Sequence, residues 1–171
     1  MVNLLPTQLH CLYLVAFFFA ISNYPVSADT RIAVFEFALK DMTLISRTAQ
    51  ELERTASIKP LLQSALEEGG HYQMVQVDMD AQMKADSGVG YLFNHHDVAA
   101  DLGEKFGAQY VVVGQIHKPS FLFVYLMAHL VEVKSKRLIG DYIVEIKGPQ
   151  RKITAKGVET LANKIKATIN P

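Results

Sequence analysis

Two pairs of residues in this sequence have side chains that could carry out chemistry. Asp78 and Asp80 lie one residue apart after a predicted strand, and His95 and His96 are adjacent at the start of a predicted helix. A pair of carboxylates can act as general acid and base or hold a divalent cation, and histidine is a common zinc ligand. These residue types therefore raise a metal-binding or hydrolytic site as one hypothesis.

The spacing of the two pairs favours another interpretation. Adjacent residues on a helix point about 100° apart, whereas zinc-binding helices place two histidines four residues apart on one face. No second acidic cluster and no nucleophile motif accompanies Asp78 and Asp80. We therefore interpret both pairs as exposed loop and helix-start residues, and we predict no catalytic residue, no metal site and no cofactor. A small periplasmic metal-binding or hydrolytic protein that uses Asp78, Asp80, His95 and His96 is kept as the alternative.

Two other segments have the composition of protein-binding surfaces. The C-terminal helix pattern carries Lys152, Lys156 and Lys166 opposite its apolar side, and such a basic face suits an acidic partner or a lipid surface. A long apolar run with no polar alternation begins with Phe121 and Phe123, and it could present an apolar face to another protein. The simpler interpretation of the two segments is a solvated helix face and a core strand. We name these five residues as candidate partner-binding residues.

The charge balance limits the class of partner. The 171 residues contain 17 Lys and Arg against 17 Asp and Glu, so the formal net charge is zero. This balance argues against binding to nucleic acid and limits any membrane contact to a peripheral one. Half of the residues are hydrophobic, as in globular proteins, and the length suits a single core. We therefore predict one domain over residues 29–171.

The first 28 residues have the pattern of a secretory signal peptide. They contain no Lys, Arg, Asp or Glu, and an apolar block from Cys11 to Ile21 precedes a Val-Ser-Ala sequence that ends at Ala28. This order predicts a signal peptide over residues 1–28 and a periplasmic or secreted product. The block is shorter than the ~20 residues that cross a bilayer. Because no Lys or Arg precedes the block, an uncleaved anchor is kept as the alternative.

Hydrophobic periodicity predicts an α/β domain with the element order βαβαβββα. We expect one mixed sheet with helices packed on it, in which helix-connected strands are parallel and the last three strands form an antiparallel meander. The segment 110–116 is a largely apolar run and should be a central strand covered on both faces. The expected strands are 31–38, 72–77, 110–116, 121–133 and 138–146, and the expected helices are 45–69, 95–106 and 151–169.

Three local features refine this expectation. Pro60 should divide the first helical segment or start a second helix at its first turn. Asn94 has the side chain of an N-cap, with Asp97 at the third helical position, where a carboxylate suits the helix dipole. Residues 78–93 lack periodicity, so we expect an exposed loop with at most one helical turn.

The segment from Phe106 to Lys118, together with the opening strand from Ala33 to Phe37, resembles a family of exported bacterial proteins known only as a domain of unknown function. The layout of strands and helices is also similar to that of the curli-secretion lipoprotein, the penicillin-binding-protein activators and the amino-terminal domain of the Tol translocation protein. Members of the family often carry a cysteine pair before the second helix. This sequence has Asn94 and two histidines there, so no role of those cysteines transfers.

The resemblance implies a function in envelope assembly or interaction without catalysis, by analogy of fold. Together with the signal peptide, it predicts an exported accessory or scaffold domain of the cell envelope that binds a protein partner. The sheet edge, the apolar segment 121–133 and the basic C-terminal helix are the candidate surfaces. A homo-oligomer is a further possibility that the sequence leaves open.

Overall fold

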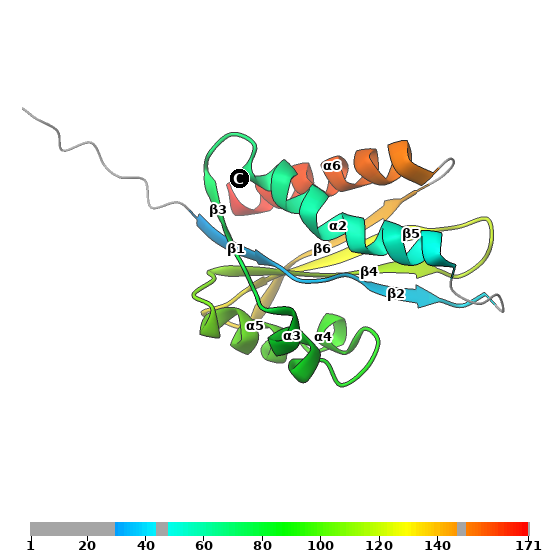
Figure 1. Cartoon of the computed structure of the whole chain (residues 1–171). Helices are drawn as coiled ribbons and strands as arrows, with labels where there is room; N and C mark the ends of the chain where they lie inside the picture. The colour runs from blue at the N-terminus through cyan, green and yellow to red at the C-terminus, as the bar shows by residue number, and fades with distance from the viewer. Residues whose placement is uncertain (1–29, 44–47, 147–149, 171) are drawn as a thin grey trace, which may run out of the picture.

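The computed structural model describes residues 30–43, 48–146 and 150–170, and for residues 150–153 only the backbone (Figure 1). The predicted signal peptide over residues 1–28 lies outside these ranges. No helix within them is both long enough and apolar enough to cross a membrane. The elements are β1 (Thr30–Val34), β2 (Ala38–Asp41), α2 (Ala49–Glu67), β3 (Tyr72–Val75), α3 (Met79–Ala85), α4 (Tyr91–Asn94), α5 (His96–Lys105), β4 (Tyr110–Lys118), β5 (Tyr125–Glu132), β6 (Arg137–Glu145) and α6 (Gln150–Ile169).

The strands form one mixed sheet, as predicted. Its order is β3-β1-β4-β5-β6, and β2 also pairs with β4. The pairs β1–β3, β1–β4 and β2–β4 are parallel, whereas β4, β5 and β6 form an antiparallel meander. β4 has a neighbour on each side, and Val112 in its middle is fully buried. The expected strand directions and the central place of segment 110–116 are therefore confirmed.

The first predicted strand, 31–38, is interrupted by a bulge. Val34 pairs with Val112 and Ala38 pairs with Gln115, so four steps along the first segment match three along β4. The extra residue bends the strand and separates β1 from β2. The ring of Phe37 lies over Gly114 in the space that a larger side chain would fill. The sequence pattern did not reveal this break because both parts are apolar.

Helices cover both faces of the sheet. In Figure 1, α2 and α6 lie on one face, and α3, α4 and α5 lie on the other. Val158, Leu161 and Ile165 recur every three to four residues along α6 and are buried against the sheet, as predicted. A second core beneath α4 and α5 joins Leu92, Phe93, Ala99 and Leu102 to strand residues. The two cores fix where each helix sits, and so where its polar side chains lie.

The predicted break at Pro60 is wrong, because α2 continues through it. Pro60 has no N–H and so cannot donate a hydrogen bond to the carbonyl of Ala56. Because both residues are exposed, water can bind this carbonyl instead. Ile58, Leu62 and Leu66 are fully buried on either side of the proline. Their packing holds both halves of the helix on the sheet.

Residues 78–93 contain more helix than expected, because α3 and the start of α4 lie there. Gln82 of α3 is buried, and its side-chain amide bonds both backbone groups of Glu36 at the bulge. The predicted N-cap at Asn94 is also wrong. Asn94 ends α4 and its side chain donates to the carbonyl of Gly90, while His95 takes the N-cap position of α5. Asp97 lies in the first turn of α5, as predicted.

Candidate functional site

The acidic pair does not join the histidine pair in a metal-binding group. Asp78 and Asp80 are exposed at the beginning of α3. Over residues 30–43, 48–146 and 150–170, no three His, Cys, Asp or Glu side chains come close enough to hold a metal ion. The structure therefore does not assemble Asp78, Asp80, His95 and His96 into the site of the alternative hypothesis.

The two adjacent histidines have different surroundings. His95 is exposed, and its ring stacks on Tyr91 with 3.9 Å between centroids. His96 is half-buried, and its Nε2 lies 2.9 Å from Nδ1 of His129 on β5. The interpretation as two exposed helix-start residues is thus correct for His95 only. Sequence patterns could not reveal the contact with His129, because it lies 33 residues from His96 along the chain.

His129 is held from several sides. Its Nδ1 lies 3.0 Å from the carbonyl oxygen of Phe93, its ring stacks on Phe93, and its Nε2 lies 3.4 Å from the Asp141 carboxylate. Burial lowers the pKa of His129, and the neighbouring His96 adds to this effect, while Phe93 and Asp141 oppose it. This group links α4 and α5 to β5 and β6 and is best explained as part of their packing.

The basic face of the C-terminal helix is only partly free. Lys156 is exposed, but Lys166 is half-buried, and its Nζ donates to the carbonyl oxygen of Glu68 at 2.9 Å. That carbonyl lies at the C-terminal end of α2, where a cation is favourable. The side chain of Lys152 lies outside the described part of the chain. Lys156 and Lys166 therefore differ in exposure and in hydrogen bonding, so they do not contribute equally to an exposed basic face.

The apolar segment predicted over 121–133 is a strand only from Tyr125 onward. The residues before it form the loop between β4 and β5, which extends beyond the sheet at the right of Figure 1. In this loop Phe121 is 64% exposed, Leu122 80% and Phe123 41%. The sequence correctly singled out Phe121 and Phe123 as apolar, and the structure places them at the surface rather than in the core.

The exposed loop continues onto one face of the sheet. The rings of Phe123 and Tyr125 are nearly parallel, with centroids 6.3 Å apart. Along β5 the next residue on the same face is Met127, which pairs with the exposed Ile143 of β6. We call the surface formed by Phe121, Leu122, Phe123, Tyr125 and Ile143 the aromatic surface.

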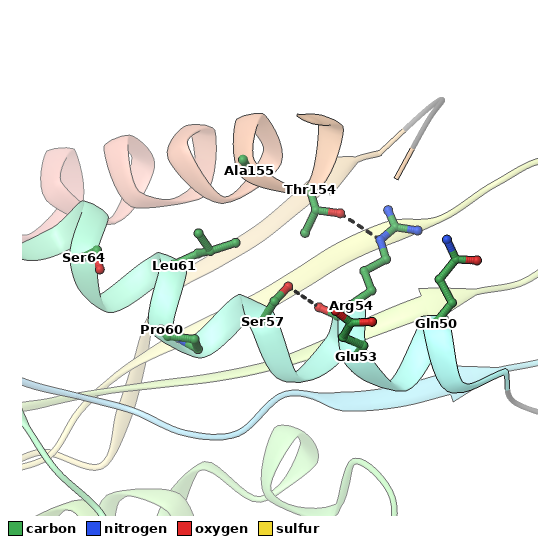
Figure 2. Close-up of a pocket in the computed structure, with 9 residues that line it drawn as sticks. All are labelled: Gln50, Glu53, Arg54, Ser57, Pro60, Leu61, Ser64, Thr154 and Ala155. Atoms are coloured by element: carbon green, nitrogen blue, oxygen red, sulfur yellow. Dashed lines mark hydrogen bonds between the residues drawn. The ribbon is translucent and has the colours of Figure 1, made fainter. Parts of the chain in front are cut away.

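A groove between α2 and α6 is a second candidate site, which the sequence analysis missed. Its cavity measures about 700 Å³ (Figure 2). Arg54 extends from α2 toward α6, and its Nε donates to Oγ1 of Thr154 at 2.9 Å. The residues that line the cavity are Gln50, Glu53, Arg54, Ser57, Pro60, Leu61, Ser64, Thr154 and Ala155.

One nitrogen of Arg54 has no partner in this groove. Its Nη2 is buried and makes no hydrogen bond in the described part of the chain. Burial lowers the pKa of Arg54, and the nearby Glu51 opposes that shift. The guanidinium nevertheless remains charged at neutral pH, because arginine titrates far above it. Sequence reasoning could not find this group, because Arg54 and Thr154 are 100 residues apart.

Comparisons with solved structures show a shared fold at low sequence identity. TolB from Acinetobacter baumannii matches with a TM-score of 0.52 and 15% identity over 83% of this chain, which spans only 28% of the TolB chain. Lipoprotein GNA1162 from Neisseria meningitidis matches with a TM-score of 0.52 and 15% identity, covering 80% of this chain and 96% of that one. The PelC dodecamer from Paraburkholderia phytofirmans matches with a TM-score of 0.51 and 13% identity, covering 84% and 88%.

Comparison at the level of sequence identifies the family. No curated protein matches the chain. The family model DUF3280, with the description "Protein of unknown function (DUF2380)", matches residues 30–165, which include every strand and all but the end of α6. The expected resemblance to a family of unknown function and to the Tol protein is therefore confirmed, and this chain belongs to the DUF3280 family.

Proposed function

We propose that this protein is an exported, non-catalytic domain of the cell envelope that binds a protein partner through the aromatic surface. The observation that carries the proposal is the exposure of three consecutive large apolar side chains, Phe121, Leu122 and Phe123, in the loop before β5. Contiguous exposed apolar side chains, aromatic ones above all, are typical of protein-binding sites.

The position of β6 supports the same conclusion. β6 is nine residues long and forms one edge of the sheet, so the backbone groups on its outer side have no strand partner in the described part of the chain. Such an edge can accept a strand from another chain, and exposed apolar residues beside it add buried area. A standard interface needs about 800 Å² from each partner, which a domain of this size can supply.

The comparisons and the N-terminal sequence support the location that we propose for the protein and the kind of partner that it binds. One structural neighbour is described as a lipoprotein, and PelC was solved as a dodecamer. Residues 1–28 have the pattern of a signal peptide. We place the protein in the periplasm, where its partner is another envelope protein or a second copy of this chain.

Site-specific photo-crosslinking tests the proposal. A photoreactive amino acid replaces Leu122, which is 80% exposed, and the matched control carries it at Gln73, an exposed residue of β3 on the opposite edge. We expect a discrete adduct in living cells from position 122 and none from position 73. The mass of the adduct distinguishes a self-dimer from a complex with another protein.

A double substitution checks that the aromatic surface, and not the label, causes the adduct. Phe121→Ser with Leu122→Ser should leave the free energy of unfolding within about 0.5 kcal/mol of wild type, because both side chains are exposed. With the photoreactive residue moved to Ile143, the double variant should lose the adduct that the otherwise unchanged chain gives. Equal labelling from positions 73 and 122, or an unchanged adduct in the double variant, would refute the proposal.

A further inference from the structure

The groove beside Arg54 is longer than its first cavity. A second hollow of about 520 Å³ shares Leu61, Ser64 and Ala155 with it and continues toward the C-terminal ends of both helices. Near the start of both helices, Arg54 of α2 donates a hydrogen bond to Thr154 of α6. Near the end of both helices, Lys166 of α6 donates to the carbonyl of Glu68, which caps α2. The two helices therefore run parallel, as Figure 1 also shows, and the two hollows form one continuous groove along them.

One end of the groove favours an anion. The buried Nη2 of Arg54 lacks an acceptor, and leaving a charged donor unpaired costs free energy that a carboxylate oxygen would recover. Glu53 lines the same end but already has an interaction of its own. The Glu51 carboxylate is paired with Lys118, and it also lies near enough to Arg54 to raise the pKa of that guanidinium, but it makes no hydrogen bond to Nη2. The N-terminal ends of two parallel helices add positive potential at this end.

The other end has the opposite charge. Glu67, Glu68 and Glu159 line the second hollow, and the C-terminal end of α2 lies beside them. Lys166 contacts this end through the Glu68 carbonyl. The charged residues among those that line the hollow are the three glutamates. This end therefore favours a positively charged group on a ligand.

The middle of the groove is largely apolar and suits an extended chain. Pro60, Leu61 and Ala155 line it between the two charged ends. Arg54 and Glu67 are thirteen residues apart on α2, which corresponds to about 20 Å at 1.5 Å per residue. An extended peptide that rises about 3.3 Å per residue spans this distance with about six residues.

We propose that the groove between α2 and α6 binds the C-terminal end of an extended peptide, with its terminal carboxylate on Arg54 and a basic group at the Glu67–Glu68 end. The charge pattern selects this occupant over a fatty acid, which would leave the acidic end without a partner. The proposal does not depend on the aromatic surface, because none of the residues that form that surface lines the groove.

Capture of defined peptide mixtures by the immobilised protein, quantified by mass spectrometry, tests the proposal. The probe is a mixture of random hexapeptides with free termini, compared with the same mixture after C-terminal amidation and after N-terminal acetylation. Decanoate is measured in parallel. We expect retention of the free peptides, about a tenfold loss on amidation, because a charge-assisted hydrogen bond is lost, and a smaller loss on acetylation. Decanoate should not compete.

Three variants localise the binding. Arg54→Met should lower retention by about tenfold, while Arg31→Met, at an exposed arginine of β1, should leave it unchanged. Ala155→Trp keeps Arg54 but fills the groove, so it should also abolish retention even if Arg54→Met alters the fold. Circular dichroism and melting curves establish that each variant is folded.

Several results would overturn the proposal. These are equal retention of free and amidated peptides, retention that survives in a folded Ala155→Trp variant, and displacement of the peptides by decanoate. Binding that is lost equally in Arg31→Met would also contradict it, because that arginine lies outside the groove.

Discussion

The side-chain amide of Gln82 takes the place of a neighbouring strand for Glu36. Its Oε1 accepts the backbone N–H of Glu36 at 2.9 Å, and its Nε2 donates to the Glu36 carbonyl at 3.1 Å. Glu36 lies at the bulge between β1 and β2, where the pairing with β4 is interrupted. A buried side chain on α3 thus satisfies the backbone groups that the bulge leaves open.

Gln82→Leu should therefore destabilise the fold strongly. It leaves two backbone groups without partners, at a cost of about 2–4 kcal/mol in the free energy of unfolding. The matched control is Gln109→Leu, whose Oε1 accepts the backbone N–H of Arg31 at an exposed position. Water can replace that bond, so the control should lose less than about 1 kcal/mol. Urea denaturation measures both, and equal losses would contradict the role given to Gln82.

Gly114→Ala tests the close contact with Phe37. A methyl group at position 114 would overlap the Phe37 ring, so the ring or the strand must move. We expect a loss of about 1–3 kcal/mol in the free energy of unfolding. Gly157→Ala, inside α6, is the control. A Cβ at position 157 would lie 3.5 Å from the side chain of Ile146, which is an ordinary van der Waals contact. It should stabilise the protein by about 0.5–1 kcal/mol, and thermal melting of the two variants should therefore shift in opposite directions.

His129 should make stability depend on pH below neutrality. Its pKa is lowered by burial in the folded state, whereas an unfolded histidine titrates near its ordinary value of about 6.5. Between these two values the unfolded chain binds more protons, so stability falls as the pH drops below about 6.5 toward the folded pKa.

Melting curves at pH ~7.5 and ~5.5 measure this effect. The melting temperature should fall on acidification, and the fall should be smaller in His129→Gln. His71→Gln, at an exposed histidine, serves as the control and should behave like wild type. If His129→Gln retains the full pH dependence, other groups cause it.

Lys166 and Lys156 should respond differently to charge reversal. Lys166→Glu removes the hydrogen bond to the Glu68 carbonyl and adds a carboxylate beside Glu67 and Glu68. This change should cost about 1–2 kcal/mol in the free energy of unfolding. Lys156→Glu, at an exposed residue, should stay within about 0.5 kcal/mol of wild type. Chemical denaturation of the two variants measures both free energies of unfolding. Equal losses in the two variants would contradict the difference between Lys166 and Lys156.

The sequence by itself determined the order of most elements, the strand directions and the buried side of α6. These follow from local patterns: apolar runs such as 110–116 and apolar residues every three to four positions, such as Val158, Leu161 and Ile165. Helical connections between strands favour parallel pairing and direct loops favour antiparallel pairing, so the strand directions also followed, whereas the order of the strands in the sheet was not predicted.

Only the tertiary structure decided where the bulge falls, which histidines are in contact and which nitrogen of Arg54 is buried without a hydrogen-bond partner. Gln82 and Glu36 are 46 residues apart, and Arg54 and Thr154 are 100 apart. Hydrophobic periodicity carries no information on contacts between such distant residues. It reports which side of a helix or strand is apolar, and not which side chain of another element packs against it. The same limit explains Pro60, where packing of Ile58 and Leu62 on the sheet outweighs a local tendency to break the helix.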